Sequence, residues 1–239
     1  MASSADLTVA AVAALRGDHA RVAPALDRAR RRRPGRDARL RRQGATGRRL
    51  NALAQGSHTS AHARLGQLFA ADGTPLHQHF SYLAIADLAE AAVRADRRVE
   101  ARALIQRALA RVDPALGPRL EQLAARALAL TAESAQTEEH FARAMASPAG
   151  RAWPFERAQL QLDYGEWLRR QRRINDAKPI LTAALDTFRR LGAVPWTARA
   201  QGELRACGVP VKDRLVPPSA LADLTAQQRE IVRGCSARG

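Results

Sequence analysis

The histidines are the first candidates for chemistry, because their spacing could suit metal binding. His77 and His79 stand two residues apart, but no cysteine or third histidine is placed to complete a tetrahedral ligand set. His58 and His62 stand four residues apart, which puts both on one face of a helix. The acidic general base of an H-E-x-x-H motif does not follow His58. We therefore expect neither pair to hold a metal ion.

The two cysteines lack the cysteine–histidine context that nucleophilic catalysis requires. We expect Cys207 to be a small buried hydrophobic residue and Cys235 to be an exposed thiol. No serine stands in a nucleophile elbow, and no G-x-x-x-x-G-K-[ST] loop is present to cradle phosphates. The sequence thus predicts no catalytic residues, no metal site and no cofactor, and we do not expect an enzyme.

The composition of the 239 residues favours helices. Hydrophobic residues make up 46% of the chain, which excludes a wholly disordered protein. Aromatic residues make up only 4% and β-branched residues are few, which argues against a β-sandwich or barrel. Alanine, leucine and arginine, which are abundant here, lose little entropy in a helix. No apolar run approaches the length of a membrane span and no basic signal-peptide start is present, so we expect an all-α cytoplasmic protein without membrane contact.

Small residues recur along the chain with a period of roughly 40 residues. They stand at positions 20, 61, 101, 137 and 177, with spacings of 41, 40, 36 and 40. Two helical stretches in each unit of this length are typical of a helical-hairpin solenoid. We expect residues 1–208 to form an α-solenoid of about five imperfect TPR-like hairpins. The residues expected to pack between its helices are Ala101, Ile105, Ala108, Phe141, Ala144, Tyr164, Gly165, Ala177, Leu181 and Ala184.

Aromatic residues gather between Trp153 and Trp196, a region that also contains Tyr164 and Trp167. They could line a ligand pocket or fill the core between hairpins, and the helical spacing of Tyr164 and Trp167 favours the core. A basic turn at 169–173 follows, and we expect it to be solvated surface near a helix end.

Much of the basic charge lies in one segment. The chain has 39 Lys and Arg against 23 Asp and Glu, a formal net charge of +16. The stretch from Arg28 to Arg49 holds eleven Arg and a single acid, Asp37. This stretch, within residues 28–50, is either a patch for nucleic acid or an acidic partner, or a solvated linker. Its lack of aromatic residues for base stacking favours the linker.

The region from Trp153 to Gly208 resembles a known family. The run WPFERAQLQLDYGEWLRR and the stretch that follows it closely resemble the last helical repeats of large actinobacterial LuxR-type transcriptional regulators, relatives of the maltose regulator. Residues 72–95 resemble an earlier repeat of the same proteins. The resemblance implies a transcriptional regulator whose repeats bind a small-molecule effector or a protein partner. The alternative is a free-standing TPR-like adaptor without DNA-binding activity.

The end of the sequence carries a second part of this resemblance. Residues 209–223 contain three prolines and are expected to form a linker, and residues 224–239 resemble the start of a LuxR-type helix-turn-helix. The residues of this stub are Leu224, Thr225, Arg229, Glu230 and Val232. Because a major-groove reader needs a recognition helix packed on a support helix, we expect DNA to be bound only through a complete domain that these residues do not supply.

Overall fold

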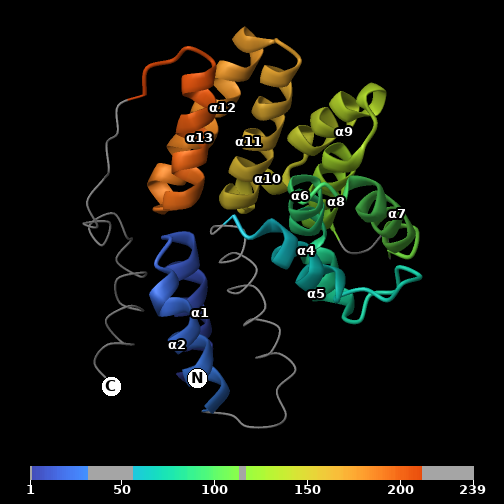
Figure 1. The fold of residues 1–239 in the computed structure, drawn as a ribbon, viewed down its shortest axis with the longest axis vertical. Helices are drawn as coiled ribbons and strands as arrows, with labels where there is room; N and C mark the ends of the chain where they lie inside the picture. Colours follow the sequence, from blue (N-terminus) through green and yellow to red (C-terminus); the bar gives the residue numbers. More distant parts are fainter. Residues whose placement is uncertain (1, 32–55, 113–116, 212–239) are drawn as a thin grey trace.

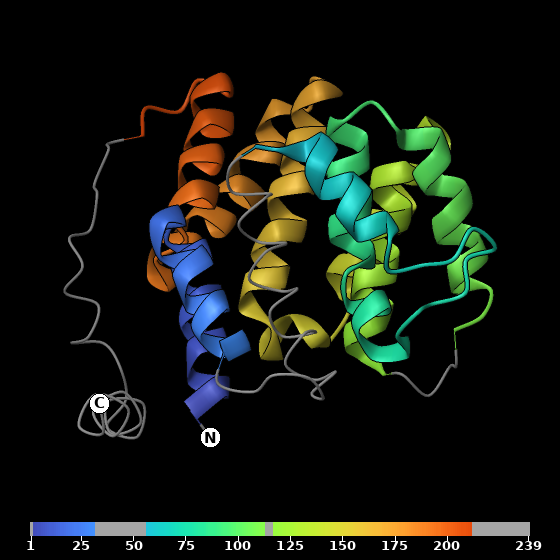
Figure 2. The same cartoon turned by 60° about the horizontal axis from the view of Figure 1, so that its bottom comes forward.

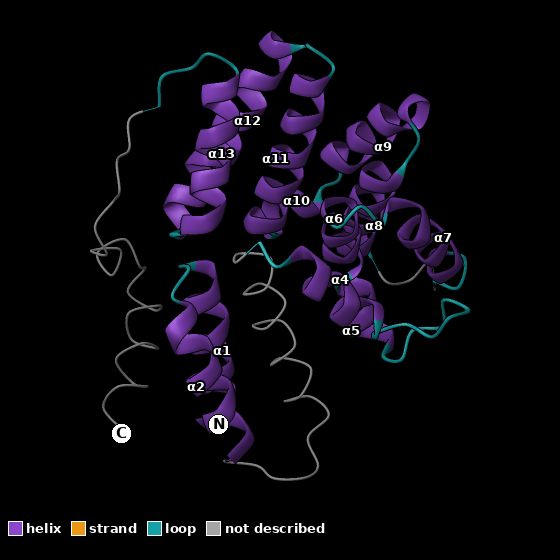
Figure 3. Ribbon diagram, in the orientation of Figure 1, coloured by secondary structure: helices purple, strands orange, loops and turns teal. Residues whose placement is uncertain are grey.

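The computed structural model describes residues 2–31, 56–112 and 117–211, and this part of the chain is built from helices joined by short turns (Figures 1 and 3). The helices are α1 (Ala2–Leu15), α2 (His19–Arg31), α4 (His58–Gly66), α5 (Gln78–Leu83), α6 (Ile85–Arg94), α7 (Arg98–Leu109), α8 (Pro118–Thr131), α9 (Ser134–Ala146), α10 (Ala149–Ala152), α11 (Pro154–Arg170), α12 (Ile174–Leu191) and α13 (Val194–Ala206). The described ranges contain no strand, only an isolated bridge between Phe69 and Pro75. The expected all-α class is therefore confirmed. Within these ranges no helix combines the length and the hydropathy needed to cross a bilayer.

Consecutive helices pack against each other as pairs, and three of the pairs share one turn geometry. The turns α1–α2, α6–α7 and α11–α12 place Gly17, Asp96 and Arg172 in the left-handed region, at φ of 72°, 58° and 60°. In each turn the next amide donates to a carbonyl five residues back, as in Asp18 N to Ala13 O at 2.9 Å. This bond satisfies a carbonyl that the end of the first helix would otherwise leave without a partner.

The second helix of each unit buries its fourth residue. In α2, α4, α7, α9 and α12 these residues are Val22, Ala61, Ala101, Thr137 and Ala177. The choice of Ala20 for the first unit was wrong, since Ala20 is exposed. Because α2 begins at His19, its fourth residue is Val22, and that position faces α1. Small or short side chains here let the paired helices approach closely.

The residues expected to pack between the helices are buried, except that Tyr164 is only partly buried. A close approach occurs at Gly165 in α11, where an added Cβ would lie 2.5 Å from Cγ of Leu181 in α12. Phe141 of α9 stacks on Tyr164 with ring centroids 5.0 Å apart. These contacts join α9, α11 and α12 into one packed body.

Helix α6 lies at the centre of the molecule. It packs against α4, α7 and α8 (Figure 1), and all residues from Ile85 to Ala92 are buried. The α1–α2 hairpin lies at the end of α13 in both Figure 1 and Figure 2, with the turn at Gly17 close to Pro195. Because residues Ile85 to Ala92 of α6 are buried, its two acidic residues, Asp87 and Glu90, need buried partners.

The arginine-rich segment is not a linker from its first residue. Helix α2 continues to Arg31, and Arg28 pairs with Asp6 of α1, with Nε 3.3 Å from Oδ1. The expected linker at 28–50 is therefore wrong for Arg28 to Arg31, which belong to α2. Residues 32–55 lie outside the described residues, as do the expected linker from 212 onward, the helix-turn-helix stub and Cys235.

Candidate functional site

A buried network of charged side chains joins four helices at the centre of the molecule. It contains four arginines and four acids, so its formal charges balance. Its members are Asp87, Glu90 and Arg94 of α6, Arg126 of α8, Asp163, Glu166 and Arg170 of α11, and Arg199 of α13. Residues far apart in sequence therefore share one set of ion pairs.

Arg126 is the hub of this network. Its side chain is only 1% exposed, and its Nη2 lies 2.6 Å from Oε2 of Glu90 and 2.7 Å from Oδ2 of Asp163. Its Nη1 donates to Oε1 of Gln159 at 3.4 Å and lies 3.6 Å from Oδ1 of Asp87. The planar guanidinium has five N–H donors in a fixed fork, which suits it to bridge acids on two helices.

Arg199 closes the network from the side of α13. Its Nη2 lies 2.9 Å from Oδ1 of Asp163 and 2.8 Å from Oε2 of Glu166, and its Nη1 pairs with Glu90. Arg94 and Arg170 also pair with Glu166 and lie nearer the surface, with side chains 27% and 55% exposed. The network therefore extends from a buried centre at Arg126 to partly solvent-exposed side chains at Arg94 and Arg170.

The two central carboxyl groups respond differently to this environment. Burial by itself would raise the pKa of Glu90, but the guanidinium groups of Arg199, Arg126 and Arg94 outweigh burial and lower it to about 2. Burial raises the pKa of Asp163, and its neighbour Glu90 adds to that effect against the attraction of Arg126. Glu90 therefore stays charged while Asp163 is the first of the two to take up a proton in acid.

We predict that Glu90 makes folding sensitive to acid. Its folded pKa lies below the unfolded value, so its contribution is complete above about pH 4.5 and is lost as the pH falls toward about 2. The shift corresponds to about 3 kcal/mol. Urea unfolding at a series of pH values measures it, and Glu90→Gln should lose most of this acid dependence. Glu121→Gln, at an exposed position of α8, should unfold with the same pH dependence as the parent. Equal acid dependence in the two variants would contradict the assignment to Glu90.

A pocket of about 500 Å³ opens beside the network. Its polar wall contains Arg94, Arg98, Arg170 and Arg199, with Glu90, Asp163 and Glu166 between them, and its other wall contains Phe141 and Trp167. Among the described residues Arg98 is a lining arginine with no ion pair, so the pocket holds one positive charge that the protein does not balance.

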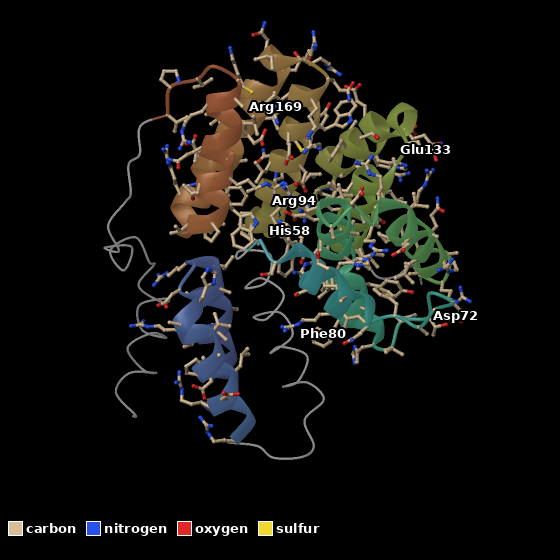
Figure 4. The ribbon with its side chains drawn as sticks, viewed as in Figure 1. His58, Asp72, Phe80, Arg94, Glu133 and Arg169 are labelled. Carbon is tan, nitrogen blue, oxygen red and sulfur yellow. The ribbon has the colours of Figure 1, made fainter. Side chains whose placement is uncertain are left out.

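His58 lines the same pocket, and Figure 4 shows it close to Arg94 of α6, the helix on which α4 packs. Its Nδ1 is buried and has no hydrogen-bond partner. Burial lowers the pKa of His58, and Arg94 adds to this. The neutral ring therefore lies beside the arginines with one of its nitrogens buried and unsatisfied.

One signal of this network is present in the sequence, although the network was not predicted from it. The pattern D-x-x-E-x-x-x-R occurs at Asp87, Glu90 and Arg94 and again 76 residues later at Asp163, Glu166 and Arg170. In the unit between them Arg126 stands 36 residues after Glu90, at the equivalent helix position. Arg126 pairs with Glu90 and with Asp163, the first residue of the second copy of the pattern.

Among the described histidine and cysteine candidates, His58 lines the 500 Å³ pocket, and His62, His77 and Cys207 do not. His77 caps α5, where its Nδ1 accepts from the amide of Phe80 at 3.5 Å, and His58 and His62 both lie on α4. Cys207 is buried at the end of α13, and burial raises the pKa of its thiol. In the described ranges no three His, Cys, Asp or Glu side chains are placed to hold a metal ion.

Two expectations about aromatic and basic residues need correction. Trp153 is not core, since it is 41% exposed and stacks under the guanidinium of Arg119, 3.6 Å from the ring centroid. Trp196, by contrast, is buried. The basic turn is solvated as expected at Arg170, Arg172 and Arg173, which are exposed, but Arg169 is partly buried and pairs with Glu203 of α13 at 2.6 Å.

Comparison of the chain with protein families, with curated proteins and with solved structures gave no match.

Proposed function

We propose that the paired helices form an α-solenoid of TPR-like hairpins that serves as the effector-sensing and protein-contact arm of a LuxR-type transcriptional regulator. Its action is binding, not chemistry. An effector in the 500 Å³ pocket stabilises one arrangement of the hairpins, and the arrangement is passed to an attached DNA reader.

Two features of the fold support the solenoid. The turns at Gly17, Asp96 and Arg172 have the same backbone geometry, and the second helices bury equivalent fourth residues. The same 76-residue offset relates Asp96 to Arg172 and Glu90 to Glu166. Recurring turns, packing positions and charges at one offset are what a stack of related hairpins requires.

The observation that carries the sensing role is the unbalanced Arg98 beside the balanced network. An anionic group on a ligand finds the guanidinium of Arg98 and the polar edge of His58 on one side of the pocket. The rest of the ligand rests on Phe141 and Trp167. A ligand that bridges these residues contacts α4, α7, α9 and α11 together. Its binding therefore stabilises one relative arrangement of these helices.

The adaptor is the second candidate. Helix α1 exposes two apolar residues one turn apart, Val9 at 44% and Val12 at 39%, and such a stripe suits contact with another protein. An adaptor of this kind has no effect on transcription of its own.

We predict that Arg98→Ala impairs regulation while leaving the fold intact, because Arg98 is exposed and unpaired in the described structure. Loss of a charged hydrogen bond lowers effector affinity by about ten-fold or more. Transcript profiles of the host are compared after deletion of the gene and after its return as parent or variant. If the protein is a regulator, the strain that carries Arg98→Ala should show the same transcript changes as the deletion strain.

Arg97→Ala is the matched control, since Arg97 is the adjacent exposed arginine, pairs with Glu100 and does not line the pocket. It should restore the parental transcript profile. Transcripts that do not change on deletion would reject the regulator and favour the adaptor. Equal effects of the two variants would reject the pocket as the sensing site.

A further inference from the structure

A second pocket, of about 250 Å³, is lined by two residues that contact the other edge of the Arg126 guanidinium. The first pocket is lined by Glu90 and Asp163, which contact Nη2 of Arg126. The second is lined by Asp87 and Gln159, which face Nη1. The proposed function does not use this second pocket.

The amide of Gln159 has one orientation in this pocket. Gln159 is 3% exposed, and its Oε1 accepts from Nη1 of Arg126 at 3.4 Å. Reversal of the amide would place its NH₂ donors against the guanidinium donors. Arg126 therefore keeps Oε1 of Gln159 facing its own guanidinium. The Nε2 group therefore points away from Arg126, and it is buried without a hydrogen-bond partner. A buried donor left without an acceptor is costly, and an acceptor in the pocket removes that cost.

The charges around the pocket are already balanced. Arg119 pairs with Glu156 through two guanidinium nitrogens, with Nε 3.1 Å from Oε2, and Asp87 faces Arg126. No unbalanced charge remains among the described lining residues to attract an ion. The pocket therefore suits a neutral ligand, in contrast to the pocket that Arg98 lines.

The walls of the pocket are apolar and partly flat. Leu123 and Phe155 lie on the inner side, and Leu191, which is 40% exposed, lies at the edge. Trp153 forms part of the mouth, and its ring is held by the guanidinium of Arg119 stacked over it. A pocket of this size with one placed polar donor is at the small end of small-molecule sites.

We propose that this pocket binds a small neutral molecule with a flat apolar body and a carbonyl oxygen, and that the carbonyl accepts a hydrogen bond from Nε2 of Gln159. The apolar body lies between Phe155 and Trp153. Binding does not depend on the regulatory role, and only the ligand's identity as a second effector rests on the proposed function. Because residues that line both pockets contact Arg126, occupation of one alters the partners of the other.

Benzamide is the probe, because it is neutral, flat and carries a carbonyl. Toluene lacks the carbonyl and benzoate adds a charge. Titration of the full chain is followed by NMR through the side-chain NH₂ signals of glutamine. We expect benzamide to shift the signal of Gln159 and to bind more tightly than toluene or benzoate.

Gln159→Met removes the donor and keeps the length of the side chain. We expect it to weaken benzamide binding by about ten-fold, the effect of one lost hydrogen bond, and to leave toluene binding unchanged. Gln122→Met is the matched control, since Gln122 is also a buried glutamine with an unpartnered amide, but it does not line the pocket. Val93→Trp fills the first pocket and should leave benzamide binding intact.

Several results would overturn the proposal. They are no shift of Gln159 at the solubility limit of benzamide, equal binding of benzamide and toluene, or equal losses in Gln159→Met and Gln122→Met. If Gln159→Met does not fold, the side-chain NH₂ signals of the parent protein provide the test. Benzamide must shift the signal of Gln159 and leave that of Gln122 unchanged. Failure here leaves the transcript test of Arg98 unaffected, so the two proposals fail separately.

Discussion

Arg126→Leu is expected to destabilise the protein by about 3–5 kcal/mol, because it removes the hub of a buried ion-pair network. The substitution leaves Glu90 and Asp163 facing each other with their side chains 4% and 2% exposed. Arg199 still contacts both, but a single guanidinium cannot supply the donors that two had given them. Arg126→Lys should recover only part of the loss, since an ammonium group cannot span acids on α6 and α11 at once.

Urea unfolding measures this effect, and Arg173→Leu is its control. Arg173 also pairs with two acids, Glu138 and Asp176, but its side chain is 42% exposed. An exposed pair contributes about 1 kcal/mol or less, so the same change there should be mild. If the two leucine variants have equal free energies of unfolding, the buried network is not what holds these helices together.

Gly165→Leu is expected to cost about 3 kcal/mol, the upper part of the range for overpacking a core. Even a Cβ at this position would lie 2.5 Å from Cγ of Leu181, which is fully buried and has no room to move away. The gain in helix propensity on replacing glycine, up to about 1 kcal/mol, acts the other way and is smaller.

A double-mutant cycle tests the register of α11 against α12. Gly165→Ala and Leu181→Ala should each destabilise the protein, and the double variant should be more stable than the sum of the two predicts, because the shortened side chain makes room for the new methyl group. Additive effects, or a parental melting temperature for Gly165→Leu, would show that Gly165 does not face Leu181.

The periodicity of small residues was enough to predict a buried position near the start of four helices. Ala61, Ala101, Thr137 and Ala177 are all buried. The predicted buried position was wrong in the first unit. Alanines are so common there that Ala20 looked equivalent to Ala61. Only the start of α2 at His19 shows that Val22 occupies the position.

The site was harder to predict than the fold. A hydropathy pattern counts Asp87, Glu90 and Arg126 as surface residues, although all three are buried. Their burial depends on which helices meet, and this is set by packing over the whole chain. The exposure of Trp153 was missed for the same reason, because its partner Arg119 lies on another helix.

Native mass spectrometry of the chain purified from its own host tests the central claim most directly. The sensing role predicts a small molecule of defined mass bound to the parent and absent from Val93→Trp, which fills the 500 Å³ pocket. Val99→Trp, the same change at a residue that is 81% exposed and outside the pocket, should keep the molecule. A parent that carries no ligand, or a ligand that survives in Val93→Trp, would contradict the claim that this pocket is the sensor.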